Sequence, residues 1–107
     1  MKLKDRVAIV TGGGKGIGEE ICLGLAKEGA KIVIAEIDIA NSENAKKKIL
    51  DTGSEAIIVK TDVSKKDSIN EMVEKAIQTF GKIDILINNA GIRLSLIHIS
   101  EPTRHDQ

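Results

Sequence analysis

Four short runs of apolar, mostly β-branched residues alternate along the chain with longer segments that have apolar residues at helical spacing. The runs are RVAIVT at 6–11, KIVIAEI at 31–37, EAIIVKTDV at 55–63 and KIDILINNAG at 82–91. Continuous apolar runs are typical of strands that are buried on both faces of a parallel sheet. The pattern predicts a three-layer α/β sandwich, with strand order 3-2-1-4 and helices on faces set by right-handed crossovers.

Three helices are expected between these runs, and each is followed by a glycine that stops it. The expected ranges are 16–28, 42–51 and 64–80, with Gly29, Gly53 and Gly81 after them. In the first helix, Ile17, Ile21 and Leu25 recur every four residues and predict one apolar stripe. At the start of the third, Ser64 with Asp67 three residues later resembles a capping box, so Ser64 is expected to cap that helix.

The composition argues against several classes of partner. The chain has 107 residues, enough for one small domain. Its 16 basic residues balance 16 acidic ones, which gives no electrostatic case for binding nucleic acid or a membrane surface. The single aromatic residue, Phe80, offers no stacking platform for single-stranded nucleic acid. The basic run Lys46–Lys48 is interpreted as a solvated helix face.

Two features bear on the cellular compartment. The N-terminal residues lack the long apolar region of a signal peptide, and no apolar run approaches transmembrane length. The single cysteine, Cys22, rules out an internal disulfide and fits a reducing compartment. We therefore expect a soluble cytoplasmic protein in which Cys22 is a small buried apolar residue; a reactive thiol is the alternative.

The segment TGGGKGIG at 11–18 lies between the first predicted strand and the first predicted helix. Its glycines let the main chain approach a bound group, and the helix that follows presents free N–H donors and a positive dipole end. Together these features predict an anion site suited to a pyrophosphate, with a tight turn that binds no ligand as the alternative. The segment does not match the P-loop pattern, because Lys15 is followed by Gly16 and not by Ser or Thr. The pattern G-x-G-x-x-G does not fit at any position, and the observed spacing is Thr-Gly-x-x-x-Gly-x-Gly.

Glu36 ends the second predicted strand, 20 residues after Gly16. An acidic residue near this position can accept hydrogen bonds from the adenosine ribose hydroxyls and would repel a 2′-phosphate, so Glu36 favours NAD over NADP. Asp38 is a less well-placed substitute, and the loop cation Lys15 argues weakly for NADP. A solvated carboxylate at a strand end is the alternative interpretation of Glu36.

Three motifs in this order, TGGGKGIG, TDVS at 61–64 and NNAG at 88–91, resemble the short-chain dehydrogenase/reductase family. The resemblance covers residues 1 to about 93. It implies a Rossmann-like, doubly wound parallel sheet and hydride transfer between a nicotinamide and a carbonyl or secondary alcohol. A 3-oxoacyl-acyl-carrier-protein reductase or an alcohol dehydrogenase would be such a parent enzyme. It also implies a small-molecule substrate and a parent that forms a homo-oligomer.

The resemblance further implies which residues bind the cofactor. Those at its pyrophosphate and adenosine side are Gly12, Gly14, Lys15, Gly16, Ile17 and Gly18. Glu36 would bind the adenosine ribose, and Asp62 and Val63 would contact the adenine. Those that line the cofactor beside the crevice are Asn89, Ala90 and Gly91, while Asn88 braces the fourth strand.

The family resemblance assigns catalysis to residues that have no counterpart here. It implies an acid/base tyrosine in a Tyr-x-x-x-Lys motif, a serine that positions the substrate oxygen, and an asparagine in a later helix. The chain contains no tyrosine, so no catalytic residue is assigned and the chain is expected to be inactive. A noncatalytic nucleotide-binding module is the alternative function.

The last segment, 94–107, differs in character from the 93 residues before it. Residues 94–104 match, in order, the translation of a transposase-based sequencing adapter, so we expect 94–107 to be a non-native tail without stable packing. His98, Glu101, His105 and Asp106 supply metal-ligand types but no preorganised geometry, and no metal site is predicted. Without native sequence beyond it, the fourth strand would leave a bare apolar edge, which predicts poor folding.

Overall fold

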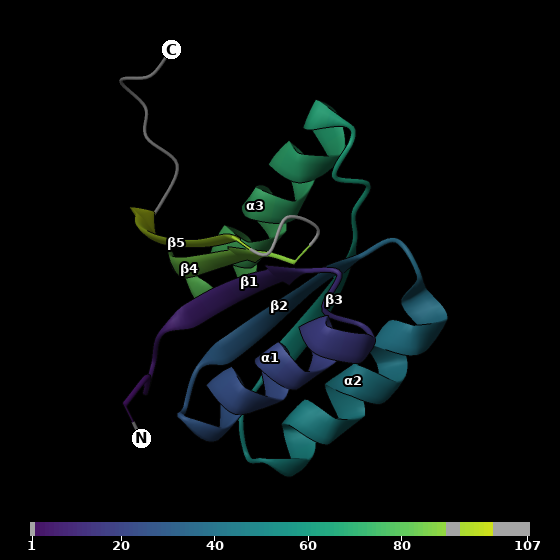
Figure 1. The fold of residues 1–107 in the computed structure, drawn as a ribbon. Helices are drawn as coiled ribbons and strands as arrows, with labels where there is room; N and C mark the ends of the chain where they lie inside the picture. The colour runs from purple at the N-terminus through teal and green to yellow at the C-terminus, as the bar shows by residue number, and fades with distance from the viewer. Residues whose placement is uncertain (1, 90–92, 100–107) are drawn as a thin grey trace.

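The computed structural model describes residues 2–89 and 93–99, and its strands form one sheet in the order β3-β2-β1-β4-β5 (Figure 1). The strands are β1 (Val7–Thr11), β2 (Lys31–Glu36), β3 (Ala56–Lys60), β4 (Ile83–Asn88) and β5 (Arg93–Ile99). The first four pair in parallel, which confirms the predicted order 3-2-1-4. Their carboxyl ends therefore meet at one edge of the sheet.

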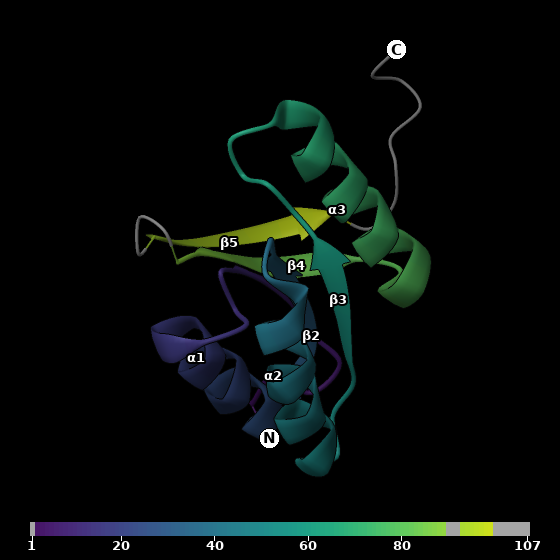
Figure 2. The same ribbon diagram turned by 90° about the vertical axis from the view of Figure 1, so that its right-hand side faces the viewer.

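Three helices cover the two faces of the sheet. They are α1 (Gly16–Lys27), α2 (Ile39–Asp51) and α3 (Lys66–Phe80). Figures 1 and 2 show α1 and α2 on one face and α3 on the other, which confirms the three-layer sandwich. In residues 2–89, none of these helices combines the length and the apolar character that crossing a bilayer requires.

The core consists of two clusters, one on each face of the sheet. On the first face, Cys22 and Ala26 of α1 pack with α2 against Val10 and its neighbours; on the second, Met72 and Ala76 of α3 pack against the alternate strand residues. All five residues of β1 are buried. Each fully buried valine or isoleucine stabilises the fold by about 1.5–3 kcal/mol. Burial on both faces explains why these strands have continuous apolar sequences.

The fourth strand does not have the bare outer edge that the sequence argument assumed. β5 pairs antiparallel with β4, in a register that places Arg93 opposite Asn88 and Ile99 opposite Ile83. The expectation that residues 94–107 lack stable packing is therefore wrong for 94–99, and the remainder lies outside the described residues. The predicted association through a bare β4 edge is also wrong, because the main chain of β5 pairs with that edge.

The apolar stripe predicted for the first helix is confirmed in part, because Ile21 and Leu25 pack against the core but Ile17 does not. Its buried residues are Gly18, Cys22 and Ala26, whereas Ile17 is 63% exposed. A helix has about 3.6 residues per turn, so a residue five positions before Cys22 lies on the far side of the helix. Small residues face the sheet, and Ile17 points away from the core that it was expected to join.

Two helices begin at other residues than expected. α2 begins at Ile39 because the carboxylate of Asp38 caps it, accepting a hydrogen bond from the backbone N–H of Asn41 at 3.3 Å. α3 begins at Lys66, and its capping residue has no side-chain cap bond. The predicted Ser64 cap is wrong, because its hydroxyl donates to the Asp62 carboxylate at 2.6 Å instead.

A buried carboxylate ties β1 to β4 at the amino ends of the strands. Asp84 is 6% exposed and accepts a hydrogen bond from the backbone N–H of Val7 at 2.9 Å. The cations of Arg6 and Lys82 lie 3.4 and 3.3 Å from its oxygens. A buried charge is tolerated when it is paired and hydrogen-bonded in this way. This network fixes the register of the two central strands, whose opposite ends form the candidate site.

Candidate functional site

A cavity of about 210 Å³ lies at the carboxyl edge of the sheet, where some of the predicted cofactor residues line it. It is lined by Thr11, Gly12, Ala35, Glu36, Ile37, Thr61, Asp62, Val63 and Asn89. Five of these, Gly12, Glu36, Asp62, Val63 and Asn89, are among the predicted residues. Open parallel sheets bind ligands in the crevice outside the carboxyl ends of their strands.

The glycine loop joins β1 to α1 beside this cavity, and its backbone requires glycine at particular positions. Gly12 and Gly16 have φ of +67° and +59°, a left-handed conformation that other residues rarely adopt. A Cβ on Gly18 would collide with the carbonyl oxygen of Gly12 and lie 2.8 Å from its carbonyl carbon. The start of α1 thus sits directly against the beginning of the loop.

The first turn of α1 offers the donors that an anion requires. Gly16, Ile17 and Gly18 open the helix, so their N–H groups lie in the turn that has no partners within the helix. A Cβ on Gly16 would meet no atom within 4 Å, and both Lys15 and Ile17 are exposed. The positive end of the helix dipole is therefore accessible to a negatively charged group.

Glu36, at the end of β2, is buried, with 8% of its surface exposed. Its Oε1 accepts a hydrogen bond from the N–H of Gly14 at 3.2 Å. Its Oε2 accepts from the N–H groups of Ile37 at 3.1 Å and Asp38 at 3.4 Å. Glu36 is thus not the solvated carboxylate of the alternative interpretation, because it faces the glycine loop and the main chain around it.

Asp62 and Val63 follow β3 and line the same cavity. The Asp62 carboxylate accepts hydrogen bonds from the Ser64 hydroxyl at 2.6 Å and the Ser64 backbone N–H at 3.0 Å. These two bonds lower the pKa of Asp62, the hydroxyl contributing most, so the group carries its charge at neutral pH. Val63 is 45% exposed, an apolar surface next to a charged group.

Thr11 links the glycine loop to the end of β4. Its hydroxyl accepts a hydrogen bond from the N–H of Asn89 at 3.0 Å and lies 3.2 Å from Asn88 Oδ1, to which it can donate. The side-chain amide of Asn89 donates to the Gly12 carbonyl at 3.4 Å. The two asparagines therefore hold the ends of β1 and β4 together. This arrangement agrees with the bracing role predicted for Asn88.

Some predicted residues cannot be placed, and some cavity residues were not predicted. Ala90 and Gly91 lie outside the described residues. The lining residues absent from the prediction are Thr11, Ala35, Ile37 and Thr61. Each is at or next to the end of a parallel strand, and that position is the signal that could have identified them. Among the described residues, no group of three or more His, Cys, Asp or Glu side chains could hold a metal ion.

Cys22 lies directly under the glycine loop, fully buried, with Sγ 3.8 Å from the Gly13 carbonyl oxygen. Burial raises the pKa of its thiol from 9.0 to about 12, with a smaller contribution from the charge of Glu19. A raised pKa keeps the thiol protonated between pH 7 and 10, and the thiolate is the nucleophile. The reactive-thiol alternative is therefore disfavoured.

We expect iodoacetamide to leave Cys22 unmodified in the folded chain at pH 8 and to alkylate it fully in urea. Because the pKa shift lowers the thiolate fraction by about a thousandfold, the folded-state reaction should be slower by at least that factor. Mass spectrometry of time points measures both rates. Alkylation of the native chain at the rate of a free thiol would contradict the buried position.

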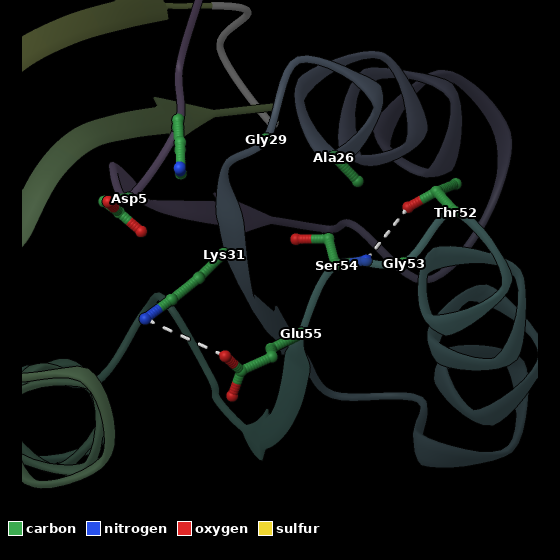
Figure 3. Close-up of a pocket in the computed structure, with 9 residues that line it drawn as sticks. Asp5, Ala26, Gly29, Lys31, Thr52, Gly53, Ser54 and Glu55 are labelled. Carbon is green, nitrogen blue, oxygen red and sulfur yellow. Dashed lines mark hydrogen bonds and ion pairs between the residues drawn. The ribbon is translucent and has the colours of Figure 1, made fainter. Parts of the chain in front are cut away.

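A second cavity lies at the opposite edge of the sheet, near the amino ends of β2 and β3 (Figure 3). Its charged side chains include Lys31, which forms an ion pair with Glu55 at 3.8 Å. The N–H of Ser54 donates to the hydroxyl of Thr52 at 3.4 Å. These contacts are made within the chain, and the cavity is separated by the sheet from the glycine loop. The carboxyl edge is therefore the candidate ligand site.

Comparison with known proteins identifies the family to which the chain is similar. The family model described as short chain dehydrogenase matches residues 6–106. A CLA biosynthesis dehydrogenase/reductase from Lactiplantibacillus plantarum is 44% identical over 91 residues, which are 85% of this chain and 32% of that protein. A short chain dehydrogenase/reductase, astE, from Aspergillus oryzae is 43% identical over 100 residues, 92% of this chain and 38% of that protein.

The structural comparison gives the same result. The crystal structure of NAD⁺-bound xylitol dehydrogenase superimposes with a TM-score of 0.79 at 32% identity, covering 81% of this chain and 34% of that one. The chain thus spans about a third of the length of the proteins it matches.

Proposed function

The chain belongs to the short-chain dehydrogenase/reductase family, and from that membership we propose that it binds the adenosine and pyrophosphate half of a nicotinamide dinucleotide. The observation that carries this proposal is the loop between β1 and α1. There Gly12 and Gly16 have the left-handed backbone that favours glycine, and the first turn of α1 beside Gly16 is open. The residues present fit a pyrophosphate, which would receive hydrogen bonds from the N–H groups of that turn.

Calorimetric titration of the full chain tests the proposal. ADP and NAD should bind with similar affinity, because the proposed contacts are with the half that they share. Nicotinamide mononucleotide, which lacks the adenosine, should bind much more weakly. If the chain binds neither ADP nor NAD in a saturable manner, the proposed function is wrong.

We propose NAD as the cofactor rather than NADP, on the position of Glu36. Its buried carboxylate lies at the cavity where an adenosine ribose would sit, and a 2′-phosphate there would meet a negative charge. The opposing cation, Lys15, is exposed and at the start of α1, so solvent screens its attraction for a phosphate. When bound, the nicotinamide cofactor supplies or accepts a hydride; the residues described here hold and orient it.

Replacing Glu36 by Ser or Arg should shift the preference from NAD toward NADP. The difference between the binding free energies of the two cofactors should change by about 1–3 kcal/mol, the contribution of hydrogen bonds to a charged group. The ratio of the two dissociation constants then changes by about 5- to 150-fold. Kinetics with both cofactors on a longer protein that continues this sequence, or titration of the chain itself, measure the ratio. An unmodified protein that already prefers NADP would show that Lys15 outweighs Glu36.

For the whole protein we propose hydride transfer between the cofactor and a carbonyl or secondary alcohol of a small molecule. This proposal is supported by the names of relatives, which include a 3beta-hydroxysteroid dehydrogenase from Eggerthella lenta and a versicolorin reductase from Emericella nidulans. We propose a homo-oligomer on the same family grounds. The alternative, a noncatalytic nucleotide-binding module, is favoured by one observation, the absence of tyrosine from the sequence.

We further propose that residues 1–93 are the native dinucleotide-binding part and that 94–107 are translated adapter. The order of the residues from Leu94 to Arg104 supports this division, whereas the family match extends to residue 106. Sequencing the source gene past the codon for Arg93 decides between them. A continuation into a Tyr-x-x-x-Lys motif would support the enzyme and the adapter origin; a stop codon soon after would support the binding module.

A further inference from the structure

The carboxylate of Glu36 accepts hydrogen bonds from three main-chain N–H groups in two segments at the carboxyl edge of the sheet. One oxygen accepts from Gly14 of the glycine loop, 22 residues earlier in the sequence. The other accepts from Ile37 and Asp38, which lead into α2. Hydrogen bonds from N–H groups to a charged, buried acceptor are about twice as strong as those between neutral groups. Glu36 therefore connects the glycine loop to the end of β2.

Packing around Gly14 supports the same conclusion independently of these bonds. A Cβ on Gly14 would lie 2.7 Å from Ser42 Oγ and 3.1 Å from Glu36 Cγ. Ser42 is fully buried, and its hydroxyl donates to the Asp38 carbonyl at 2.9 Å. By contrast, a Cβ on Gly16 would meet open space. The loop is thus packed against Glu36 and α2 at Gly14 and is open at Gly16, where a ligand could approach.

The bonds already made limit what Glu36 can offer to a ribose. A carboxylate has about four lone-pair positions, two on each oxygen. Oε2 accepts two hydrogen bonds and Oε1 accepts one. About one position, on Oε1, is left for a ligand hydroxyl. A ribose could gain a second bond to Glu36 only if a main-chain bond were lost.

We propose that Glu36 is a positioning residue for the glycine loop, and that its bond to the Gly14 N–H sets the shape in which the loop binds pyrophosphate. The inference rests on the proposed function and adds a second role to the residue. It implies that replacing Glu36 weakens binding even of a nucleotide that has no ribose hydroxyls. It also implies that such replacements lower the affinity for NAD and NADP together while they change the ratio between them.

Glu36→Met is the informative substitution because it keeps roughly the volume of the side chain and removes both carboxylate oxygens. The hydrogen bonds from the N–H groups of Gly14, Ile37 and Asp38 are then all lost. Glu36→Gln is less informative, because its amide oxygen can take the place of Oε1 and keep the bond to Gly14. Glu36→Ala serves as the full deletion.

Asp38→Asn is the matched control. It removes one negative charge at the same edge of the sheet, two residues away. The Asp38 carboxylate accepts from the backbone and the side chain of Asn41, at 3.3 and 2.8 Å. Asparagine is an equally good helix cap, so α2 should be preserved. A general electrostatic effect would appear in this control, whereas an effect through Gly14 would not.

The experiment compares ADP with dideoxy-ADP, which lacks both ribose hydroxyls, by NMR titration of the full chain. In Glu36→Met we expect dideoxy-ADP to bind about fivefold more weakly or worse, the effect of about one lost hydrogen bond. Hydrogen exchange of the Gly14 amide should accelerate in the same variant. Asp38→Asn should stay within about twofold of the original chain for dideoxy-ADP binding, by the same scale.

The outcomes separate the two proposals. If Glu36→Met weakens ADP but leaves dideoxy-ADP binding and Gly14 exchange unchanged, Glu36 is a ribose acceptor alone and the inference is wrong. If Asp38→Asn weakens dideoxy-ADP as much as Glu36→Met does, the effect is one of charge, and the inference is again wrong. If the original chain binds neither nucleotide, the proposed function fails. Amide spectra of each variant show whether the fold is retained, and Glu36→Met carries the test should Glu36→Ala unfold.

Discussion

The 107-residue chain should show no measurable dehydrogenase activity with NAD(H) or NADP(H), even at high protein concentration. The family resemblance assigns proton transfer to a tyrosine, and the sequence contains none. Positioned acid/base catalysis is worth about 10²–10⁴-fold in rate on its own. The serine that would position the substrate oxygen also has no assigned counterpart. A chain that binds the adenosine half of the cofactor would thus hold one reactant without activating the other.

The test follows the absorbance of reduced nicotinamide in the presence of a panel of ketones and secondary alcohols. A longer protein that continues the sequence into a Tyr-x-x-x-Lys motif is the positive control. A variant with the loop disrupted, Gly18→Ala, distinguishes activity of the chain from that of a contaminant. Turnover that increases in proportion to the chain and disappears in Gly18→Ala would contradict the prediction.

The sheet order was predictable because it depends on features that repeat along the chain. β1 and β2 are buried along nearly their whole length, so their sequences show the continuous apolar pattern of parallel strands. The turn glycines are also local signals: Gly29, Gly53 and Gly81 all have positive φ after a helix. Helix starts were less accurate, since the side chain that caps a helix can be one that the sequence pattern did not single out, as Asp38 is for α2.

What the sequence could not predict depends on contacts between distant segments. The bond from the Val7 N–H to Asp84 spans 77 residues, and it exists only because β1 and β4 are neighbours in a particular register. Ile17 satisfied the apolar spacing of a helix but is exposed, whereas Gly18 and Cys22 are buried against the main chain of the glycine loop. The spacing of apolar residues does not predict how closely a helix approaches the loop before it.

The candidate site shows the same division. The glycine loop and Glu36 were identifiable from motif spacing, because a strand, a tight loop and a helix follow one another directly. The sequence could not show that Glu36 faces Gly14 rather than solvent, because this depends on how close the end of β2 lies to the glycine loop. The role of Ser64 was mistaken for a local reason, because its hydroxyl donates to the carboxylate of Asp62, two residues earlier, and does not cap the helix.

Gly18→Ala should cause the largest loss of stability among substitutions in the glycine loop. The added Cβ would collide with the Gly12 carbonyl oxygen, and it would also lie 2.8 Å from the Gly12 carbonyl carbon and 3.0 Å from the Gly13 Cα. All three atoms belong to the main chain, so no side-chain rotation relieves the contact. Overpacking in a dense region costs about 1–3 kcal/mol and occasionally more, and we expect the upper end or beyond. Separation of α1 from the loop would also displace the N–H groups of its first turn, so ADP binding should be lost.

Gly24→Ala supplies the matched control on the same helix. A Cβ on Gly24 meets no atom within 4 Å, and the residue lies in the interior of α1. Alanine is favoured over glycine there by about 1 kcal/mol, so the free energy of unfolding should rise. The identical chemical change should therefore have opposite signs six residues apart, a contrast that urea unfolding of the two variants measures directly. A Gly18→Ala chain at least as stable as the original would show that α1 can move away from Gly12 without a loss of stability. The proposal that the close approach of Gly18 to Gly12 shapes the loop would then be wrong.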